Sequence, residues 1–229
     1  MVDKMATTRS AGLRPAVTPA SSRPFDEIRI RCRYRLPHWE AEGSTYSITF
    51  RLADSLPGIV LASLEQERTE AMTAALKAGC ALTTHERRRI GDVFSEKVDA
   101  FLDAGHGECF LANPEIARIV VNSLDFFNGS RYRLSAWCIM PNHVHVVFKP
   151  LNGRTLADIL HSWKSFTANK ANVCLGRKGA FWQREYYDRL IRDEDEFFRI
   201  TGYVIENPVK AGLENWRWVW VEGNVGKWE

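Results

Sequence analysis

The chain has 229 residues, of which 45% are hydrophobic and 11% aromatic. A chain of this size buries a substantial core but leaves little room for extra modules, so we expect one compact domain. The formal net charge of +3 is too small to require a nucleic-acid partner by itself. A nucleic-acid partner would therefore have to be bound by a local site and not by the overall charge.

The cysteines and the N-terminal segment bear on where the protein works. The five cysteines include no Cys-X-X-Cys pair, which argues against a disulfide framework or a zinc ribbon. No apolar run approaches the roughly 18 residues of a membrane span, and residues 1–24 lack both periodicity and the apolar stretch of a signal peptide. We expect a cytoplasmic protein with reduced thiols, no membrane partner and a disordered leader over residues 1–24.

Arginine alternates with other residues in the segment 29–35, Arg-Ile-Arg-Cys-Arg-Tyr-Arg. In an extended conformation, one edge of this segment is positively charged along its whole length. The segment is either a solvated stretch or an arm that contacts phosphates.

The next elements predict the layers of the fold. Residues 44–52 alternate as a half-buried strand does, and residues 59–78 and 85–104 show helical spacing of apolar residues. Asn113 and Pro114 provide a cap and a first turn for a helix that reaches Phe127.

The second half of the chain continues this pattern. Residues 132–139 and 144–148 are two β-rich runs joined by a short turn, which predicts neighbouring antiparallel strands. Helices are predicted over residues 155–173 and 194–206, the second ended by Pro208. Together the elements indicate an α+β domain with helices packed on an antiparallel sheet.

Two histidines lie at the start of the second of these strands. His143 and His145 are two residues apart, and residues two apart in a strand point to the same face. Because Val144, between them, points to the opposite face, we expect the histidine face to border a cleft. From the residues alone, the pair is a structural pair, a zinc site or a catalytic divalent-metal site.

A phenol and an amide follow on the last predicted helix. Tyr203 and Asn207 are four residues apart, so both lie on one helix face and their polar groups converge. The alternative is a tyrosine packed by its ring beside an asparagine that caps the helix end. Tyr186 and Tyr187, in an aromatic and charged segment, are the competing candidate nucleophiles.

Three segments, in this order, resemble the single-tyrosine HUH transposases, an insertion-sequence-200-like family, and within it the REP-associated tyrosine transposases. The segments are residues 136–145, 181–192 and 203–213. The resemblance extends from about residue 38 to about residue 218, and the order and spacing of three motifs are far more specific than any one of them.

This resemblance implies a ferredoxin-like fold over a transposase domain at residues 25–229. It implies that His143 and His145 bind a divalent metal, Mg²⁺ or Mn²⁺, and that Tyr203 is the nucleophile. Asn207 stands where the family carries a third ligand, which in insertion-sequence members is often glutamine. The asparagine side chain is one methylene shorter than that of glutamine. The resemblance also implies that REP-associated relatives carry asparagine at this position.

The implied activity is that of a DNA transposase and endonuclease. Such an enzyme cleaves and rejoins single-stranded DNA at hairpin or palindromic repeat ends through a 5′-phosphotyrosine intermediate, as a monomer or a homodimer. Cations and aromatic rings that follow the histidines are candidate DNA contacts, since stacking and phosphate pairing both hold single strands. They are Lys164, Lys170, Trp182, Arg184, Arg189 and Arg192.

Two other functions remain open. One is a metal-dependent hydrolase in which water attacks and Tyr203 only packs. The other is a non-catalytic protein, derived from a transposase, that binds single-stranded DNA hairpins. Separately, alternation in Trp216, Trp218 and Trp220 favours core or interface packing over base stacking.

Overall fold

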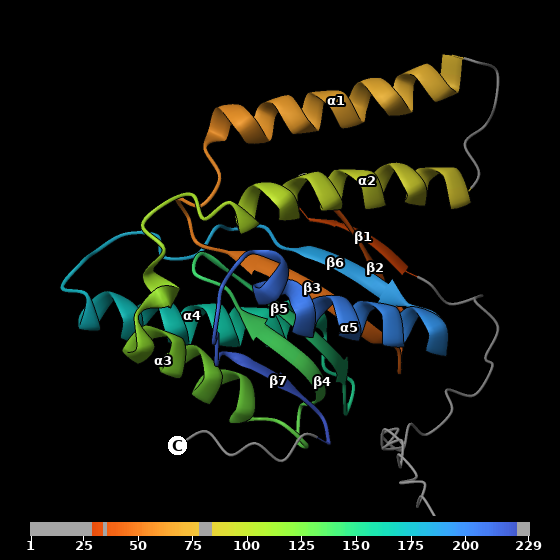
Figure 1. Ribbon diagram of the computed structural model, residues 1–229. Helices are drawn as coiled ribbons and strands as arrows, with labels where there is room; N and C mark the ends of the chain where they lie inside the picture. Colours follow the sequence, from red (N-terminus) through yellow and green to blue (C-terminus); the bar gives the residue numbers. More distant parts are fainter. Residues whose placement is uncertain (1–28, 34–35, 78–83, 224–229) are drawn as a thin grey trace, which may run out of the picture.

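The computed structural model describes residues 29–33, 36–77 and 84–223 (Figure 1). The predicted leader, residues 1–24, lies outside these ranges. The charged segment 29–35 falls partly within them: residues 29–33 form a strand, and the positions of their side chains are outside the description.

Helices and strands follow the predicted order, with two strands, β2 and β6, that were not predicted. The strands are β1 (Arg29–Arg33), β2 (Leu36–Glu40), β3 (Thr45–Arg51), β4 (Tyr132–Ile139), β5 (His143–Pro150), β6 (Tyr187–Ile191) and β7 (Val219–Val221). The helices are α1 (Gly58–Lys77), α2 (Thr84–Asp103), α3 (Pro114–Asp125), α4 (Leu156–Cys174) and α5 (Glu194–Lys210), with a short 3-10 helix, η2, at Phe110–Ala112.

The main sheet has five strands in the order β6-β3-β5-β4-β7, and every neighbouring pair is antiparallel. β3 is followed by helices, β4 and β5 pair directly, and α4 then leads to β6. This succession with the spatial order fourth, first, third, second is the ferredoxin-like arrangement. β7 extends the sheet beside β4, and β1 pairs with β2 in a separate two-stranded sheet. The predicted α+β fold class is confirmed.

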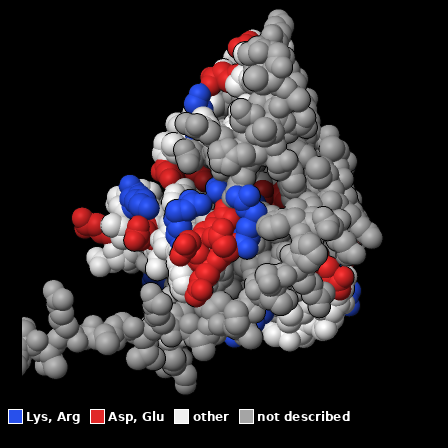
Figure 2. All heavy atoms as spheres, turned by 90° about the vertical axis from the view of Figure 1, so that its right-hand side faces the viewer, with Lys and Arg blue, Asp and Glu red and all other residues white. Residues whose placement is uncertain are grey.

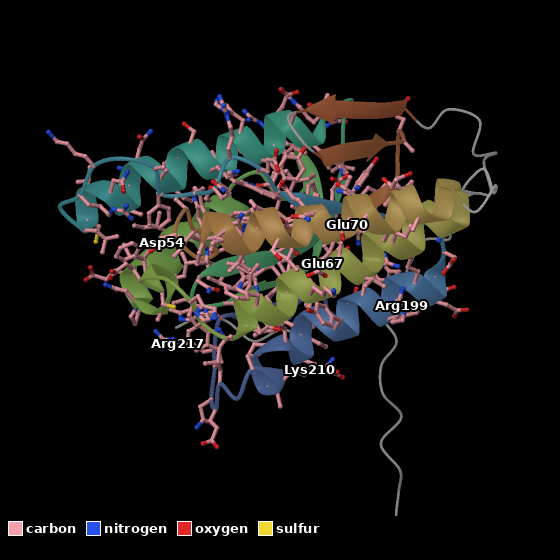
Figure 3. The ribbon with its side chains drawn as sticks, turned by 90° about the horizontal axis from the view of Figure 1, so that it is seen from above. Asp54, Glu67, Glu70, Arg199, Lys210 and Arg217 are labelled. Carbon is pink, nitrogen blue, oxygen red and sulfur yellow. The ribbon has the colours of Figure 1, made fainter. Side chains whose placement is uncertain are left out.

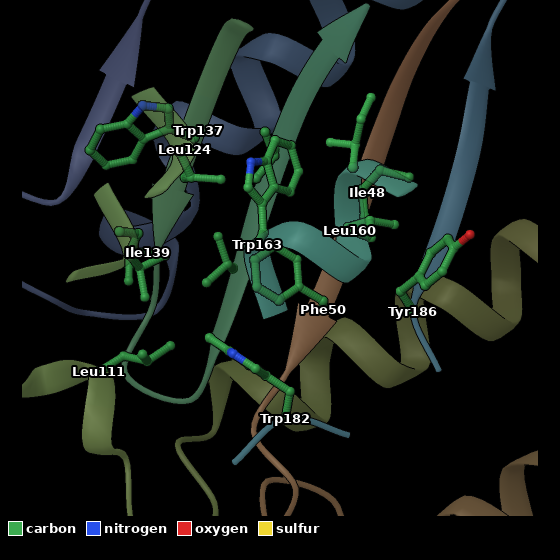
Figure 4. Packing of buried hydrophobic residues seen from close by; sticks show 14 of the residues in the cluster. Ile48, Phe50, Leu111, Leu124, Trp137, Ile139, Leu160, Trp163, Trp182 and Tyr186 are labelled. Atoms are coloured by element: carbon green, nitrogen blue, oxygen red, sulfur yellow. The ribbon is translucent and has the colours of Figure 1, made fainter. Parts of the chain in front are cut away.

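One face of the sheet carries the main hydrophobic core. Alternate residues of β3, such as Ile48 and Phe50, point to this face and pack against α3 and α4. Trp163 of α4 lies at the centre of the core (Figure 4). Its indole N–H donates to the Tyr132 hydroxyl at 2.9 Å. The late tryptophans Trp216, Trp218 and Trp220 also pack against it, so core packing is confirmed for them.

Local sequence signals explain the helix starts. The side chain of Asn113 accepts a hydrogen bond from the Glu115 N–H at the start of α3, as predicted. Thr155 and Asp193 cap α4 and α5 in the same way, and each satisfies an N–H group that has no partner within the helix.

The predicted end of the last helix is wrong. α5 continues through Pro208 to Lys210, although proline removes a hydrogen-bond donor. Asn207 and Pro208 are both buried, so packing of this last turn outweighs the lost hydrogen bond. The helix ends at Lys210 with Ala211 as its C-cap, and Gly212 follows with a φ of 71°, which glycine adopts most readily.

The second face of the sheet is covered by α5 and α2. Ile200 and Val204 of α5 pack with Val147 and Cys138 of the sheet, and Phe94 of α2 packs on Tyr187 of β6 with ring centroids 6.0 Å apart. Viewed from above, α1 and α2 lie over the sheet with α5 beside α2 (Figure 3). No helix in the described ranges combines the length and apolarity needed to cross a bilayer.

Candidate active site

The strand register places both histidines on the face covered by α5 and α2. On β5, His145 lies opposite Thr49 of β3, and His143 lies opposite Arg51. Val144 points into the main core on the other side, as predicted. The expected open cleft on the histidine face is wrong, because His143 and His145 are 0% and 1% exposed. Helices that pack from distant parts of the chain close this face.

The position of the proton on His143 follows from its neighbour Asn142. The Asn142 amide nitrogen donates to the carbonyl oxygens of Leu102 and His106, at 3.0 and 2.9 Å. Its amide oxygen is therefore left to accept, and it lies 2.7 Å from His143 Nδ1. His143 thus carries its proton on Nδ1 and directs the lone pair of Nε2 into the site.

His145 directs the matching atom to the same point. Its Nδ1 lies 2.8 Å from the Thr49 hydroxyl, and its Nε2 lies 2.9 Å from His143 Nε2. Burial lowers the pKa of His145 to about 4, and burial together with the charge of His145 lowers the pKa of His143 well below its ordinary value. Both rings are therefore neutral at pH 7, which is the form that binds metals.

Helix α5 brings the predicted amide to the two histidines. Asn207 is 0% exposed, and its Nδ2 lies 3.3 Å from His145 Nε2. Its Oδ1 is buried without a hydrogen-bond partner among the described residues. A half-turn of the amide exchanges Oδ1 with Nδ2 and directs the oxygen at the histidine nitrogens. An asparagine is thus long enough to reach the site.

Tyr203, one turn before Asn207, stands beside the same cluster. Its ring lies 5.7 Å from the His145 ring, centroid to centroid, and its hydroxyl donates to Asp99 Oδ2 at 3.3 Å. Burial raises the pKa of Tyr203, and the negative charges of Asp99 and Asp103 raise it further. The phenol is therefore protonated at neutral pH, so any reaction at its oxygen requires a proton acceptor.

Two carboxylates from α2 complete the cluster, and the sequence prediction missed both. Asp103 Oδ1 lies 3.5 Å from His143 Nε2 and has no hydrogen-bond partner among the described residues. Burial raises the pKa of Asp103 to about 6, an effect that the nearby Lys210 partly opposes. Asp99 lies one turn earlier on α2. Neither residue stands in a motif, so only the packing of α2 over the sheet reveals them.

The cluster has the chemistry of a divalent-metal site. Ligand atoms of Asp103, His143 and His145 all lie within 4.8 Å of one another. Two nitrogens that bind one ion at about 2.1 Å are about 3.0 to 3.4 Å apart for common ligand angles, close to the 2.9 Å between the two Nε2 atoms. The unpaired oxygens of Asp103 and Asn207 provide two further donors. These residues fit a bound cation.

The predicted DNA contacts fall into two groups. Trp182 is 7% exposed, packs on Phe50 and donates to the Thr167 hydroxyl at 2.8 Å, which leaves no exposed ring face for stacking. Lys164 donates to the carbonyl oxygens of Gln183 and Arg184. The side chains of Arg184, Arg192 and Lys170 are exposed.

Arginines near the start of α5 are engaged within the protein. Arg189, Arg192 and Arg199 surround the buried carboxylate of Glu196, with Arg189 closest at 2.9 Å. Figure 2 shows acidic and basic side chains next to one another on the face turned to the viewer. Among the described residues of this face, the charge is mixed, so it does not form a uniformly basic surface.

Comparisons with known proteins agree with the sequence-based resemblance. Residues 122–207 match the family described as "Transposase IS200 like", and this segment contains His143, His145, Tyr203 and Asn207. The chain is 26% identical over 81 residues to a REP-associated tyrosine transposase of Escherichia coli, across 35% of this chain and 47% of that protein. It is 31% identical over 87 residues to a Haemophilus influenzae protein assigned to the same group, across 34% of this chain and 49% of the relative. The matches thus span about half the length of these relatives.

Solved structures give weaker matches. A REP-associated tyrosine transposase bound to a REP hairpin aligns over 82% of both chains with a TM-score of 0.42 and 15% identity. A Deinococcus radiodurans transposase structure aligns over 73% of this chain with a TM-score of 0.30 and 11% identity. Both scores are below 0.5, so the fold assignment rests on the strand order itself.

Proposed function

We propose, from the match of residues 122–207 to the IS200-like transposases, that this protein cleaves and rejoins single-stranded DNA with Tyr203 as its nucleophile. One observation carries the proposal. Tyr203 and Asn207 on α5 meet His143 and His145 on β5, so the family's candidate nucleophile and ligands form one cluster. Residues that only stabilise a core do not require this convergence of polar atoms.

In the proposed reaction, the Tyr203 oxygen attacks a backbone phosphorus of DNA. The bond from Tyr203 to phosphorus forms while the bond from phosphorus to the 3′-oxygen breaks, which leaves a 5′-phosphotyrosine and a free 3′-hydroxyl. Asp99, whose Oδ2 already accepts the Tyr203 hydroxyl, takes the phenol proton, and the leaving 3′-oxygen takes a proton from water. Because the new ester replaces the old one, a 3′-hydroxyl can reverse the step without ATP.

The ligand set assigned to the cation is His143, His145, Asn207 and Asp103. When bound, Mg²⁺ or Mn²⁺ supplies positive charge that polarises the phosphate and orients the scissile bond. Asn142 and Thr49 hold the two imidazole rings in position through their Nδ1 atoms. The proposed substrate is single-stranded DNA with hairpin or palindromic repeats, held in part by the exposed side chains of Lys170 and Arg184.

The other two functions predict different products. A metal-dependent hydrolase releases cleaved DNA without a protein link, and a hairpin-binding protein leaves the DNA intact. The Tyr203 hydroxyl donates to the Asp99 carboxylate beside the ligand cluster. This contact favours a transesterase over the hydrolase and over the binding protein.

The test uses the full-length protein, Mn²⁺ and a library of labelled hairpin oligonucleotides. On a denaturing gel, the parent protein is expected to give a protein-linked band that needs Mn²⁺ and is absent from Tyr203→Phe. Cleaved DNA without a linked band would favour the hydrolase. Binding without cleavage across the library would favour the binding protein.

A further inference from the structure

We propose that Arg51 holds the scissile phosphate of the DNA strand while Tyr203 attacks it. This inference rests on the proposed function and adds a residue that the family match does not contain, because Arg51 lies outside residues 122–207. It gives a role to the buried guanidinium of Arg51, whose hydrogen bonds within the described residues are incomplete.

The strand register fixes where Arg51 lies. It is the last residue of β3 and pairs directly with His143 of β5, as Thr49 pairs with His145. Directly opposed residues of an antiparallel pair share a sheet face, with Cβ atoms about 4.5 to 5.5 Å apart. The Arg51 side chain therefore lies on the same sheet face as the candidate metal ligands and begins next to His143.

The Arg51 side chain is buried but incompletely paired. It is 2% exposed, and its Nη1 has no hydrogen-bond partner in the described part of the chain. A hydrogen bond to the Tyr187 side chain accounts for part of the group, and the charges of Glu185 and Glu65 act on it as well. Arginine stays charged in proteins, so the remaining N–H donors face the interior as a cation.

Such an arrangement costs stability unless another group completes it. A buried donor that lacks a partner carries the full desolvation cost of its polar group, so the Nη1 group of Arg51 does not stabilise the fold by itself. A donor left without a partner beside reactive groups indicates that the partner comes from outside the chain. The planar guanidinium matches the oxygens of a phosphate, which is the group that Tyr203 must approach.

A second cation supports an anion at this place. Gln183 donates its backbone N–H to the Arg51 carbonyl at 2.8 Å, and its own carbonyl accepts from Lys164 at 2.6 Å. Arg51 and Lys164 are thus tied to the same residue. Burial lowers the pKa of Lys164 to about 8, the charge of Arg51 contributes to this effect, and the charge of Glu185 partly opposes it. A phosphate beside Arg51 would relieve this repulsion.

In the reaction, Arg51 makes and breaks no covalent bond. Its Nη1–H donates to a non-bridging oxygen while the Tyr203–phosphorus bond forms and the bond to the 3′-oxygen breaks. Charge on the non-bridging oxygens is then balanced by the guanidinium throughout the step.

The experiment compares the parent with Arg51→Met and Arg51→Lys on a hairpin oligonucleotide that the parent cleaves, under single-turnover conditions with Mn²⁺. Arg133→Met is the matched control, since Arg133 is exposed and pairs with Glu222 at 2.7 Å. Formation of the protein-linked band is expected to slow about 100-fold in Arg51→Met and to be unchanged in Arg133→Met. The unfolding temperature of each variant is measured in parallel, which separates a loss of fold from the loss of the phosphate contact.

The decisive comparison replaces the scissile phosphate by a neutral methylphosphonate. If Arg51 balances the phosphate charge, Arg51→Met and the parent should link to this DNA at equal rates. The inference would be overturned if Arg51→Met slowed linking equally on phosphate and on methylphosphonate, or did not slow it on phosphate. Either result would leave the proposed function intact. Absence of a linked band with the parent would overturn both. Should Arg51→Met fail to fold, Arg51→Lys, which keeps the charge without the planar fork, is compared on the two linkages in the same way.

Discussion

Tyr203 of α5 donates its hydroxyl to Asp99 of α2 across 3.3 Å, so two helices that are distant in sequence meet at the oxygen proposed to attack DNA. The region that supplies Asp99 precedes the segment matched to the transposase family. The candidate site is therefore built from the family segment together with a helical cover, α2, that lies outside it.

Asp99→Asn should slow formation of the protein–DNA link about 10- to 100-fold, because the amide cannot take the phenol proton. Mn²⁺ binding, followed by its effect on the unfolding temperature, should be retained. Asp125→Asn, an exposed carboxylate at the end of α3, serves as the control. Equal linking rates in parent and Asp99→Asn would remove Asp99 from the reaction.

Metal binding should depend on the histidine pair rather than on the tyrosine. Mn²⁺ at 100 times its dissociation constant should stabilise the parent by about 2.7 kcal/mol. Tyr203→Phe should keep this gain, whereas His143→Ala and His145→Ala should lose it along with cleavage, while keeping most DNA affinity. The measurement is thermal unfolding with and without Mn²⁺. If Mn²⁺ stabilised both alanine variants as much as the parent, the histidines would be a structural pair.

Lys164 should make stability depend on pH. Its folded pKa of about 8 is below the unfolded value of about 10.4, so between these values the unfolded chain binds more protons. The free energy of unfolding of the parent should therefore rise with pH across this window, relative to Lys164→Met, by about 2 kcal/mol. Urea unfolding of both proteins at pH 7 and pH 10 measures the difference. A constant difference would show that Lys164 has an ordinary pKa.

Trp182 and Lys170 should separate stability from DNA affinity. Trp182→Ala should lower the free energy of unfolding by about 3 to 5 kcal/mol, because the ring is buried in the core. Lys170→Ala should leave stability unchanged and weaken hairpin binding, with a smaller salt dependence. Chemical unfolding and binding titrations at several salt concentrations test both. A stable Trp182→Ala protein with weakened binding would restore Trp182 as a stacking residue.

Period-two and helical patterns predicted most of the fold because those elements bury one face each. β6 was missed because its residues Tyr187 to Leu190 are all half-buried, which leaves no clear alternation to detect. The end of α5 was misplaced because burial of Asn207 and Pro208, a tertiary effect, outweighs the local preference of proline.

The site was predictable to the extent that it follows local geometry. Spacing placed His143 beside His145 and Tyr203 beside Asn207, and the resemblance joined the two pairs. Asp99 and Asp103 were not predictable, since their position depends on how α2 packs across the sheet. The same packing buries the histidine face that the strand pattern alone predicted to be open.

The most direct test of the central claim identifies the residue that carries the DNA. The protein-linked product is treated with nuclease and protease, and mass spectrometry locates the nucleotide on its peptide. The account predicts the adduct on Tyr203, within the α5 peptide. An adduct on Tyr186 or Tyr187, or a product without any linked residue, would contradict it.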